Sequence, residues 1–292
     1  MSKKSIQLGI GSYTFPWHVG VPGAVPSQHL TVLELIDKAV ALDIHLIQIG
    51  DNHPLELYEP QQLEEIRDKL AQENCSIELG ARGLTAKRLA RHIELAAYFG
   101  SRLIRFVPDE HGRLVDLKTA KEIIKDHIED LERGGITLAL ENHDRFPARE
   151  LDRFILSINS DHVGICLDTV NSMGCGEGYE TIVEWLAPHA VNLHIKDFTI
   201  YRHSHKMGFT IEGRIAGEGM LNIPDLLQKL SVYGRCHTAI LEQWVPPNAG
   251  IVDTIKKEEK WAVRSIAYLR TVHQWDGIKP SRNKTRPPLV KK

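Results

Sequence analysis

The chain lacks the features that mark membrane, secreted and nucleic-acid-binding proteins. No run in its 292 residues approaches the ~18–20 apolar residues that a membrane span requires. The first residues, Met-Ser-Lys-Lys, lead directly into a strand pattern and contain no signal-peptide core. Lys and Arg number 36 against 38 Asp and Glu, and this near balance gives no general attraction to nucleic acid or anionic membrane. We therefore expect a cytoplasmic protein with neither a membrane nor a nucleic-acid partner.

Cysteine is also scarce, and its spacing is uninformative for metal binding. The four cysteines, Cys75, Cys166, Cys175 and Cys236, are scattered without a CxxC pair. This pattern predicts a reduced protein with neither a disulfide framework nor a cysteine zinc site. The overall composition, 42% hydrophobic and 25% charged, is typical of a soluble globular protein with a sizeable core.

Eight short strand-like runs alternate with helix-like segments. They are Ile6–Ser12, His45–Gly50, Ser76–Ala81, Arg102–Val107, Ile136–Glu141, Val163–Asp168, Val191–Lys196 and Thr238–Gln243. Apolar residues spaced three or four apart lie between the runs, and Asn222 and Gly234 are suited to begin and end one helix. No change of composition divides the chain. The pattern predicts an α/β fold, a single (β/α)8 TIM barrel over residues 1–278, followed by a basic, Pro-containing tail over 279–292.

Four consecutive runs each place one metal-competent side chain near the C-terminal end. These side chains are Glu141, Asp168, His194 and Glu242; the first three lie on the opposite parity from the large apolar residues of their runs, and Glu242 shares its parity with Thr238 and Ile240. A single Glu at a strand end is more often a solvated or salt-bridged residue than a ligand. Four such groups inside one apolar barrel would be costly unless they shared a cation. The sequence therefore predicts one metal site.

The composition of this ligand set indicates both the metal and the chemistry. Carboxylates with one imidazole suit a single divalent ion, Mn²⁺, Mg²⁺ or Co²⁺, better than a structural zinc ion. Such an ion can bind adjacent oxygens of a sugar and stabilise the enediolate left when a carbon-bound proton departs. Glu141 and Glu242 are then the candidate catalytic acid and base. We expect an isomerase or epimerase acting on a small carbohydrate.

Other polar residues near the strand ends are candidate substrate contacts. They are His53, Asn142, His143, Asn171, Lys196, Arg202, His205 and Arg214. Long loops at the C-terminal face of a barrel commonly contact substrate, and the connection 197–223 is the longest in the chain. Its basic residues are suited to bind a carboxylate or phosphate. The structural alternatives are turn capping by Asn142, ion pairing of Lys196 with Asp168 or Glu141, and solvated charge on the loop.

The whole layout resembles the sugar phosphate isomerase/epimerase family with the xylose isomerase-like barrel. The resemblance rests on the order of LEN (Leu140–Asn142), CLDTVNS (Cys166–Ser172), NLHIKDF (Asn192–Phe198), AGEG (Ala216–Gly219) and LEQW (Leu241–Trp244). It implies that Glu141, Asp168, His194 and Glu242 hold Mn²⁺, Mg²⁺ or Co²⁺ and that the two Glu act as acid and base. Barrels of this family often associate, so the resemblance also implies a homo-oligomer.

Two narrower resemblances set the alternatives. The segments GSYTFPW, QIGDNHP, LENHDRF and HIKDF resemble a subgroup that decarboxylates 3-oxo-isoapionate, a β-keto acid. This implies a lyase that decarboxylates or dehydrates a keto-sugar acid at the same metal site. Endonuclease IV also has a similar barrel, but it places a His where this chain has Asn171, which disfavours a trinuclear DNA-repair enzyme. A non-catalytic sugar-binding barrel is a further alternative, which the intact ligand set disfavours.

Overall fold

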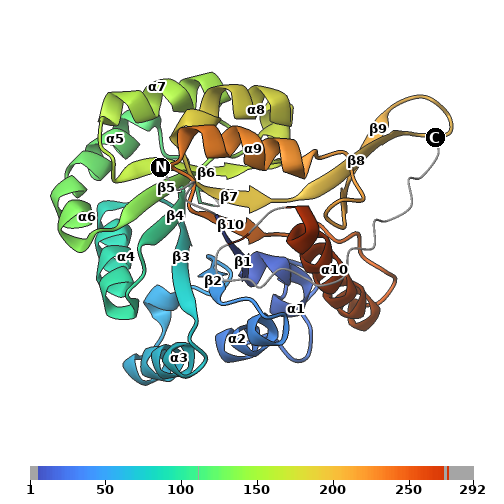
Figure 1. Cartoon of the computed structure of the whole chain (residues 1–292), viewed down its shortest axis with the longest axis horizontal. Helices are drawn as coiled ribbons and strands as arrows, with labels where there is room; N and C mark the ends of the chain where they lie inside the picture. The colour runs from blue at the N-terminus through green and yellow to red at the C-terminus, as the bar shows by residue number, and fades with distance from the viewer. Residues whose placement is uncertain (1–5, 111, 273–274, 276–292) are drawn as a thin grey trace.

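The computed structural model describes residues 6–110, 112–272 and 275. At its centre, eight parallel strands form a closed barrel surrounded by helices (Figure 1). The strands are β1 (Gln7–Gly11), β2 (Leu46–Ile49), β3 (Ser76–Arg82), β4 (Leu103–Val107), β5 (Thr137–Glu141), β6 (Val163–Asp168), β7 (Ala190–Ile195) and β10 (Thr238–Leu241). The predicted TIM barrel is confirmed, and each predicted run coincides with its strand to within one or two residues. The tail 279–292 lies outside the described residues.

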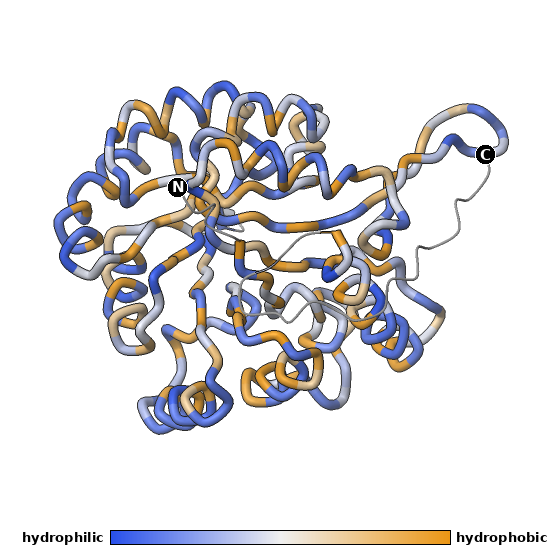
Figure 2. The backbone as a smooth tube through the Cα atoms, viewed as in Figure 1, coloured by the Kyte–Doolittle hydropathy of each residue, from blue (hydrophilic) through white to orange (hydrophobic). Residues whose placement is uncertain are grey.

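Helices connect the strands and cover the outer face of the barrel. They are α1 (Pro16–Val19), α2 (Val32–Ala41), α3 (Pro60–Gln72), α4 (Ala86–Phe99), α5 (Leu117–Lys125), α6 (Ile128–Gly134), α7 (Ala148–Ile158), α8 (Tyr179–Leu186), α9 (Ile223–Tyr233) and α10 (Ile251–Val272). Hydrophobic and hydrophilic segments alternate along them (Figure 2). The predicted ends of α9 are confirmed: Asn222 Oδ1 accepts from Asp225 N, and Gly234 follows in a left-handed conformation. No helix in the described ranges is long and apolar enough to cross a bilayer.

The main core lies between the barrel and the helices. Leu193 and Ile195 of β7 point into it and are fully buried, as are Leu35 and Ile36 of α2. The opposite face of each strand lines the barrel interior, where space is limited. A Cβ added to Gly9 would lie 2.7 Å from the Ile240 side chain, so glycine is the residue that fits there. Strand alternation thus separates an apolar outer layer from an interior of small and polar residues.

A one-residue shift between β6 and β7 aligns two of the predicted ligands. Cys166 pairs with Asn192, but the preceding rung is offset, so Val191 is an extra residue in β7. Val191 packs inside the barrel, although sequence alternation indicated the outer face. Beyond the shift, Asp168 lies directly opposite His194. The irregularity therefore brings these two side chains to the same level at the C-terminal end.

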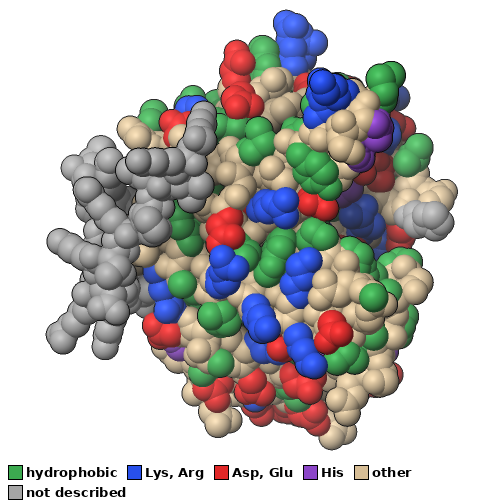
Figure 3. Space-filling model, turned by 90° about the vertical axis from the view of Figure 1, so that its right-hand side faces the viewer, with side chains coloured by type: hydrophobic (Ala, Val, Ile, Leu, Met, Phe, Trp, Pro, Cys, Tyr) green, Lys and Arg blue, Asp and Glu red, His purple; other side chains and the backbone are tan. Residues whose placement is uncertain are grey.

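The connection after β7 contains a hairpin that the sequence analysis treated as a loop. β8 (Asp197–Arg202) and β9 (Phe209–Arg214) pair antiparallel and project away from the barrel (Figure 1). One face carries Ile200, Phe209 and Ile211, whose exposed fractions are 39%, 56% and 44%. On the side of the molecule seen in Figure 3, hydrophobic side chains lie among Lys and Arg. The basic residues and turn signals of this segment concealed its short period-2 pattern.

Asp197 fixes the base of the hairpin. Its Oδ1 accepts hydrogen bonds from the backbone N–H groups of Phe198 (2.8 Å) and Leu221 (3.1 Å). Its Oδ2 accepts from the N–H groups of Gly217 (2.8 Å) and Gly219 (3.0 Å). A Cβ on Gly219 would lie only 2.1 Å from Asp197 Oδ1, so this approach requires glycine. One buried carboxylate thus joins the beginning of β8 to the segment that follows β9.

Replacing this carboxylate by an amide is expected to destabilise the protein. In Asp197→Asn, whichever oxygen becomes NH₂, two backbone N–H donors lose their acceptor and face another donor. We expect the free energy of unfolding to fall by about 2–4 kcal/mol, measured by urea denaturation. Asp68→Asn, at an exposed carboxylate on α3, is the control and should leave stability unchanged. Equal stability of the two variants would contradict the assigned role.

Candidate functional site

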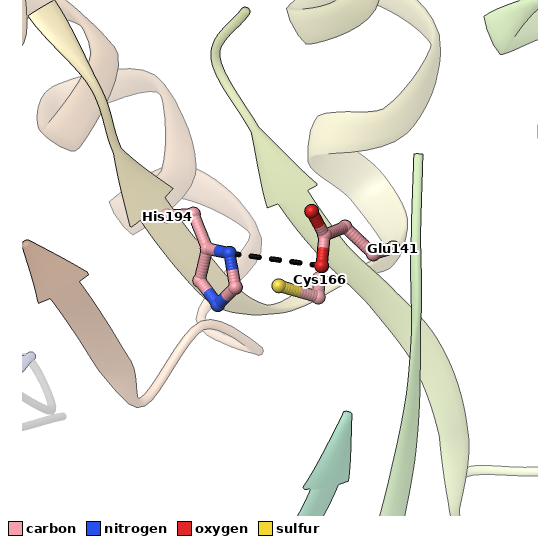
Figure 4. A group of neighbouring side chains, drawn as sticks. All are labelled: Glu141, Cys166 and His194. Atoms are coloured by element: carbon pink, nitrogen blue, oxygen red, sulfur yellow. Dashed lines mark ion pairs between the residues drawn. The ribbon is translucent and has the colours of Figure 1, made fainter. Parts of the chain in front are cut away.

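Side chains from four neighbouring strands converge at the C-terminal end of the barrel. Glu141 ends β5, Asp168 ends β6, His194 lies on β7, and Glu242 directly follows β10. All four are buried. His194 Nδ1 lies 3.2 Å from Glu242 Oε1 and 3.8 Å from both Glu141 Oε2 and Asp168 Oδ2. Figure 4 shows this ring nitrogen facing Glu141, with the Cys166 thiol beside the pair. The four predicted ligands therefore form one cluster.

The hydrogen bonds behind His194 indicate which ring nitrogen carries the proton. His194 Nε2 lies 2.8 Å from Gln48 Oε1. The amide nitrogen of Gln48 donates to Glu78 Oε2 (2.9 Å) and Asn192 Oδ1 (3.4 Å), so its oxygen is the atom left to accept. His194 Nε2 is therefore the donor. Burial lowers the pKa of His194 well below its usual value, and the neutral ring presents the Nδ1 lone pair to the carboxylates.

A lone pair among carboxylate oxygens requires a cation between them. Glu141 Oε2 and Asp168 Oδ2 each lie against one cation of the chain, Arg105 and Lys196, whereas His194 Nδ1 is a buried atom without a hydrogen-bond partner among the described residues. Candidate ligand atoms of Asp168, His194 and Glu242 all lie within 4.8 Å of one another. Two or more carboxylates and one imidazole are a donor set for a divalent ion. The geometry and the donor chemistry of this cluster fit a divalent metal.

Cys166 lies next to this cluster but is a weaker candidate ligand. Its Sγ, with Glu141 and His194, forms a second group of possible ligand atoms within 4.8 Å of one another. The thiol donates to Asn192 Oδ1 at 3.0 Å. Burial raises the pKa of Cys166 well above its usual value, and only a thiolate binds metal well. The oxygen-rich set remains the better ligand group.

Lys196 neutralises part of the negative charge of the cluster. Its Nζ lies 2.8 Å from Asp168 Oδ2 and 2.7 Å from Glu242 Oε2. Although burial alone would lower the pKa of Lys196, these carboxylates raise it above its usual value. The ammonium also lies 5.9 Å from the centre of the Trp244 ring. The pairing with Asp168 that the sequence suggested is present, and Glu242 is the second partner.

Arg105 provides a second buried positive charge, which the sequence analysis missed. It lies on β4 with 2% of its surface exposed, and its Nε is 2.8 Å from Glu141 Oε2. Its Nη1 is 3.2 Å from Asp51 Oδ1, and Asp51 also contacts Tyr13 Oη (3.1 Å) and Arg82 Nε (3.4 Å). Burial raises the pKa of Glu141 to about 7, although Arg105 opposes this shift. Charges of alternating sign therefore run from Glu141 to Arg82.

A signal for two of the missed residues was present in the sequence. Arg105 is the only charged residue in the strand Leu103–Val107, and Gln48 is the only polar residue in Leu46–Ile49. A polar side chain within an apolar strand must find partners inside the barrel. Strand alternation alone draws attention to residues at strand ends and does not reveal these two mid-strand positions.

Two cavities flank the cluster. One, of about 520 Å³, is lined by Glu242 and Lys196, with Tyr13, Trp17 and Trp244 among its walls. The other, of about 470 Å³, lies beside Glu141 and includes Arg82, His143 and Asp144 in its lining. Glu242 and Glu141, the candidate acid and base, therefore line different cavities. Strand β9 also contributes Ile211, Glu212 and Gly213 to the larger cavity.

The candidate substrate contacts occupy different environments. Asn171 Nδ2 donates to Glu141 Oε1 (2.5 Å), which places Asn171 within the cluster. His143 Nε2 lies 3.4 Å from Arg82 Nη2 and lines the smaller cavity. His53 is 8% exposed and lines neither of the two cavities. Of these three, His143 lines a cavity, whereas Asn171, like His53, is 8% exposed and lines neither, so substrate contact by these residues stays a prediction.

The predicted contacts from the hairpin do not line either cavity. Arg202 Nη1 donates to Lys206 O, and His205 stacks on His203 near the tip. Arg214 pairs with Glu212, whose side chain lines the larger cavity. Arg202, His205 and Arg214 make local contacts within the hairpin, and substrate contact by them stays a prediction.

Asn142 supports the cluster from behind. Its Nδ2 donates to Asp168 O (2.9 Å) and Ser172 Oγ (2.9 Å), and its Oδ1 accepts from Asp168 N (2.7 Å). The side chain is completely buried and its polar atoms are engaged. Of the two roles considered for Asn142, the geometry favours support of Asp168 over contact with substrate.

Comparisons with known proteins agree with the fold. Residues 36–272 match the xylose isomerase-like TIM barrel family. The chain is 29% identical over 264 residues to 3-oxo-isoapionate decarboxylase of Pectobacterium atrosepticum, covering 90% of this chain and 95% of that protein. Among solved structures, it is similar to a xylose isomerase-like TIM barrel protein of Mycobacterium smegmatis in complex with magnesium (TM-score 0.65, 16% identity, 90% and 97% coverage). It is also similar to D-psicose 3-epimerase in the presence of D-fructose (TM-score 0.67, 17% identity, 91% and 99% coverage).

Truncating Asn142 is expected to lower stability. Asn142→Ala leaves the backbone N–H and carbonyl of Asp168 without their buried partner, and we expect the free energy of unfolding to fall by about 2–3 kcal/mol in urea denaturation. Asn248→Ala, at an exposed asparagine, is the matched control and should be neutral. An Asn142→Ala protein of unchanged stability would argue instead for a role in substrate binding.

Proposed function

The chain belongs to the xylose isomerase-like TIM barrel family, and we propose that it is a divalent-metal-dependent lyase that decarboxylates a β-keto sugar acid. The decarboxylase relative matches nearly the whole chain at 29% identity, whereas the epimerase structures share the fold at 17% or less. The observation that carries the proposal is the balance of charge at the site.

The charged groups of the site balance best with an anionic substrate. Four carboxylates and three cations are linked by the ion pairs described above: Asp51, Glu141, Asp168 and Glu242 against Arg82, Arg105 and Lys196. With all four carboxylates ionised, as a bound cation favours for Glu141, their sum is −1, and a divalent ion would change it to +1. A substrate with one carboxylate then gives a neutral site, whereas a neutral ketose leaves a positive charge uncompensated. Buried charge without compensation is costly, so the site favours a monoanionic sugar acid.

Glu141, Asp168, His194 and Glu242 would hold the metal, with Mn²⁺, Mg²⁺ or Co²⁺ as the candidates for this donor set. When bound, the ion would supply Lewis-acid stabilisation of negative charge on a substrate carbonyl oxygen. Asn142 and Gln48 keep Asp168 and His194 in place from behind. The protein thus provides a prearranged site instead of one assembled from mobile side chains.

The remaining groups can be assigned to the steps of decarboxylation. The bond between the carboxyl carbon and its neighbour breaks, CO₂ leaves, and the electron pair moves toward the ketone oxygen. The Lys196 ammonium stabilises the charge that develops there. The carbon then takes a proton from water, which the Glu242 carboxylate, lining the larger cavity, would orient and relay. Arg82, beside the smaller cavity, is the candidate to bind the substrate carboxylate before it leaves.

An isomerase or epimerase is the second candidate. Glu141 and Glu242 open on different cavities, as expected for two groups that remove and return a proton on opposite sides of a sugar. The sequence alone placed this reaction first. The decarboxylase relative and the charge balance favour decarboxylation instead.

Metal binding is expected at one ion per chain. Isothermal titration of chelator-treated protein with MnCl₂ should show a single site, and Asp168→Asn should weaken binding by more than about 100-fold, since even loss of a supporting partner costs 10–100-fold. Asp144→Asn is the control, because this carboxylate lies in the smaller cavity but outside the cluster. Equal affinity of the two variants would place the ion elsewhere.

The reaction is tested by proton NMR in D₂O with the Mg²⁺-loaded protein. A panel of β-keto sugar acids and neutral ketoses should yield a product one carbon shorter from an acid, with deuterium on the newly protonated carbon. Glu242→Gln is expected to lower turnover by about 100-fold or more. Glu212→Gln, in the same cavity but outside the cluster, should stay active. Deuterium exchange into a ketose with all carbons kept would favour the epimerase instead.

A further inference from the structure

The interior of the barrel below the metal cluster is polar. TIM barrel interiors are generally filled by layers of branched apolar side chains. Here Gln48 of β2, Glu78 of β3 and Asn192 of β7 meet inside, each with at most 4% of its surface exposed. Glu78 also lines a cavity of about 680 Å³ at the opposite mouth of the barrel. These side chains form a continuous polar column, Glu78–Gln48–His194, from that mouth to the cluster.

The donors and acceptors of the column leave one arrangement. Asn192 Oδ1 accepts from the Cys166 thiol, so its amide nitrogen points to Thr238 Oγ1 (2.7 Å) and Glu78 Oε2 (3.2 Å). Glu78 Oε2 also accepts from Gln48 Nε2 at 2.9 Å. Burial raises the pKa of Glu78 to about 7, and above that pH the carboxylate offers only acceptors, so the amide nitrogen of Gln48 faces it. The Gln48 oxygen is then turned toward His194.

We propose that Glu78 is a positioning residue for the metal site: acting through Gln48, it fixes the ring orientation and tautomer of His194 so that Nδ1 is free to bind the ion. The inference rests on the proposed metal-dependent function. Glu78 contacts neither the proposed ligands nor a substrate in this arrangement. Glu78 acts by setting the direction of two hydrogen bonds, the one from Gln48 to Glu78 and the one between His194 and Gln48.

The alternative is that the column only fills the barrel interior. The two explanations differ when the direction of the hydrogen bonds changes while the volume stays constant. In Glu78→Gln, the amide at position 78 offers either an oxygen or an NH₂ group to Gln48. Gln48 can then turn over and present its own NH₂ to His194, which places the proton on Nδ1 and blocks the ligand atom. A space-filling role predicts no such change, because Gln and Glu are nearly equal in size.

Titration with MnCl₂ tests the proposal. Glu78→Gln is expected to weaken Mn²⁺ binding by about 10–100-fold. The exchange variant Gln48→Glu with Glu78→Gln should recover most of the affinity, because the carboxylate at position 48 accepts from His194 Nε2–H and from the amide at position 78. Glu65→Gln, at an exposed glutamate on α3, is the control. Wild-type affinity in Glu78→Gln, or a weakened affinity that the exchange does not restore, would overturn the proposal.

The tautomer is measured separately in the metal-free protein. Long-range ¹H–¹⁵N NMR, with the His194 signals assigned by their loss in His194→Gln, should show an Nε2-protonated ring in the wild type and a mixture of tautomers in Glu78→Gln. An Nδ1-protonated ring in the wild type would refute the inference without any substitution at position 78. If the wild type has the expected tautomer but binds no divalent ion, the proposed function fails and the hydrogen-bond assignment stands.

Discussion

Negative charge held in a closed space is the constraint to which the surrounding structure responds. Glu141, Asp168 and Glu242 share the buried end of the barrel with the Nδ1 lone pair of His194. Such a group of like charges is stable only with cations among them. Lys196 and Arg105 supply two from within the chain, and both are buried although Lys and Arg rarely are. The clustered ligand atoms of Asp168, His194 and Glu242 are the candidate site for a third cation, which we propose is a divalent metal ion.

Backbone irregularities bring these charges together. Without the extra residue in β7, Asp168 would lie opposite Leu193, and the imidazole of His194 would be displaced from Asp168 by one residue along the strand. Glycines on the inner face of β1 leave room for the Ile240 side chain of the neighbouring strand β10. Asn142 then holds the last residue of β6 through both its N–H and its carbonyl. Side-chain chemistry at the site therefore depends on where the sheet departs from regular geometry.

Most of the fold and the four proposed ligands could be predicted from the sequence, because both follow from local alternation and from what each strand places at its C-terminal end. Arg105 stands out in the sequence as a charge within an apolar strand, but its partners could not be predicted, because Glu141 and Asp51 are distant in the sequence. The β7 irregularity and the hairpin also depend on pairing between segments, which a single strand pattern does not reveal. The homo-oligomer, the cytoplasmic location and the limits of the domain stay predictions.

The base and the tip of the hairpin meet different requirements: the base is held in a fixed position beside the site, and the tip lies outside it. Asp197 and the close approach of Gly213 to the Trp244 backbone fix its base beside the larger cavity. Its tip extends away from the barrel and has no part in the ligand cluster (Figure 1). The length and composition of the tip can therefore change without moving any of the proposed ligands. A graft at the tip would add a new surface to the molecule while the end of the barrel keeps its arrangement.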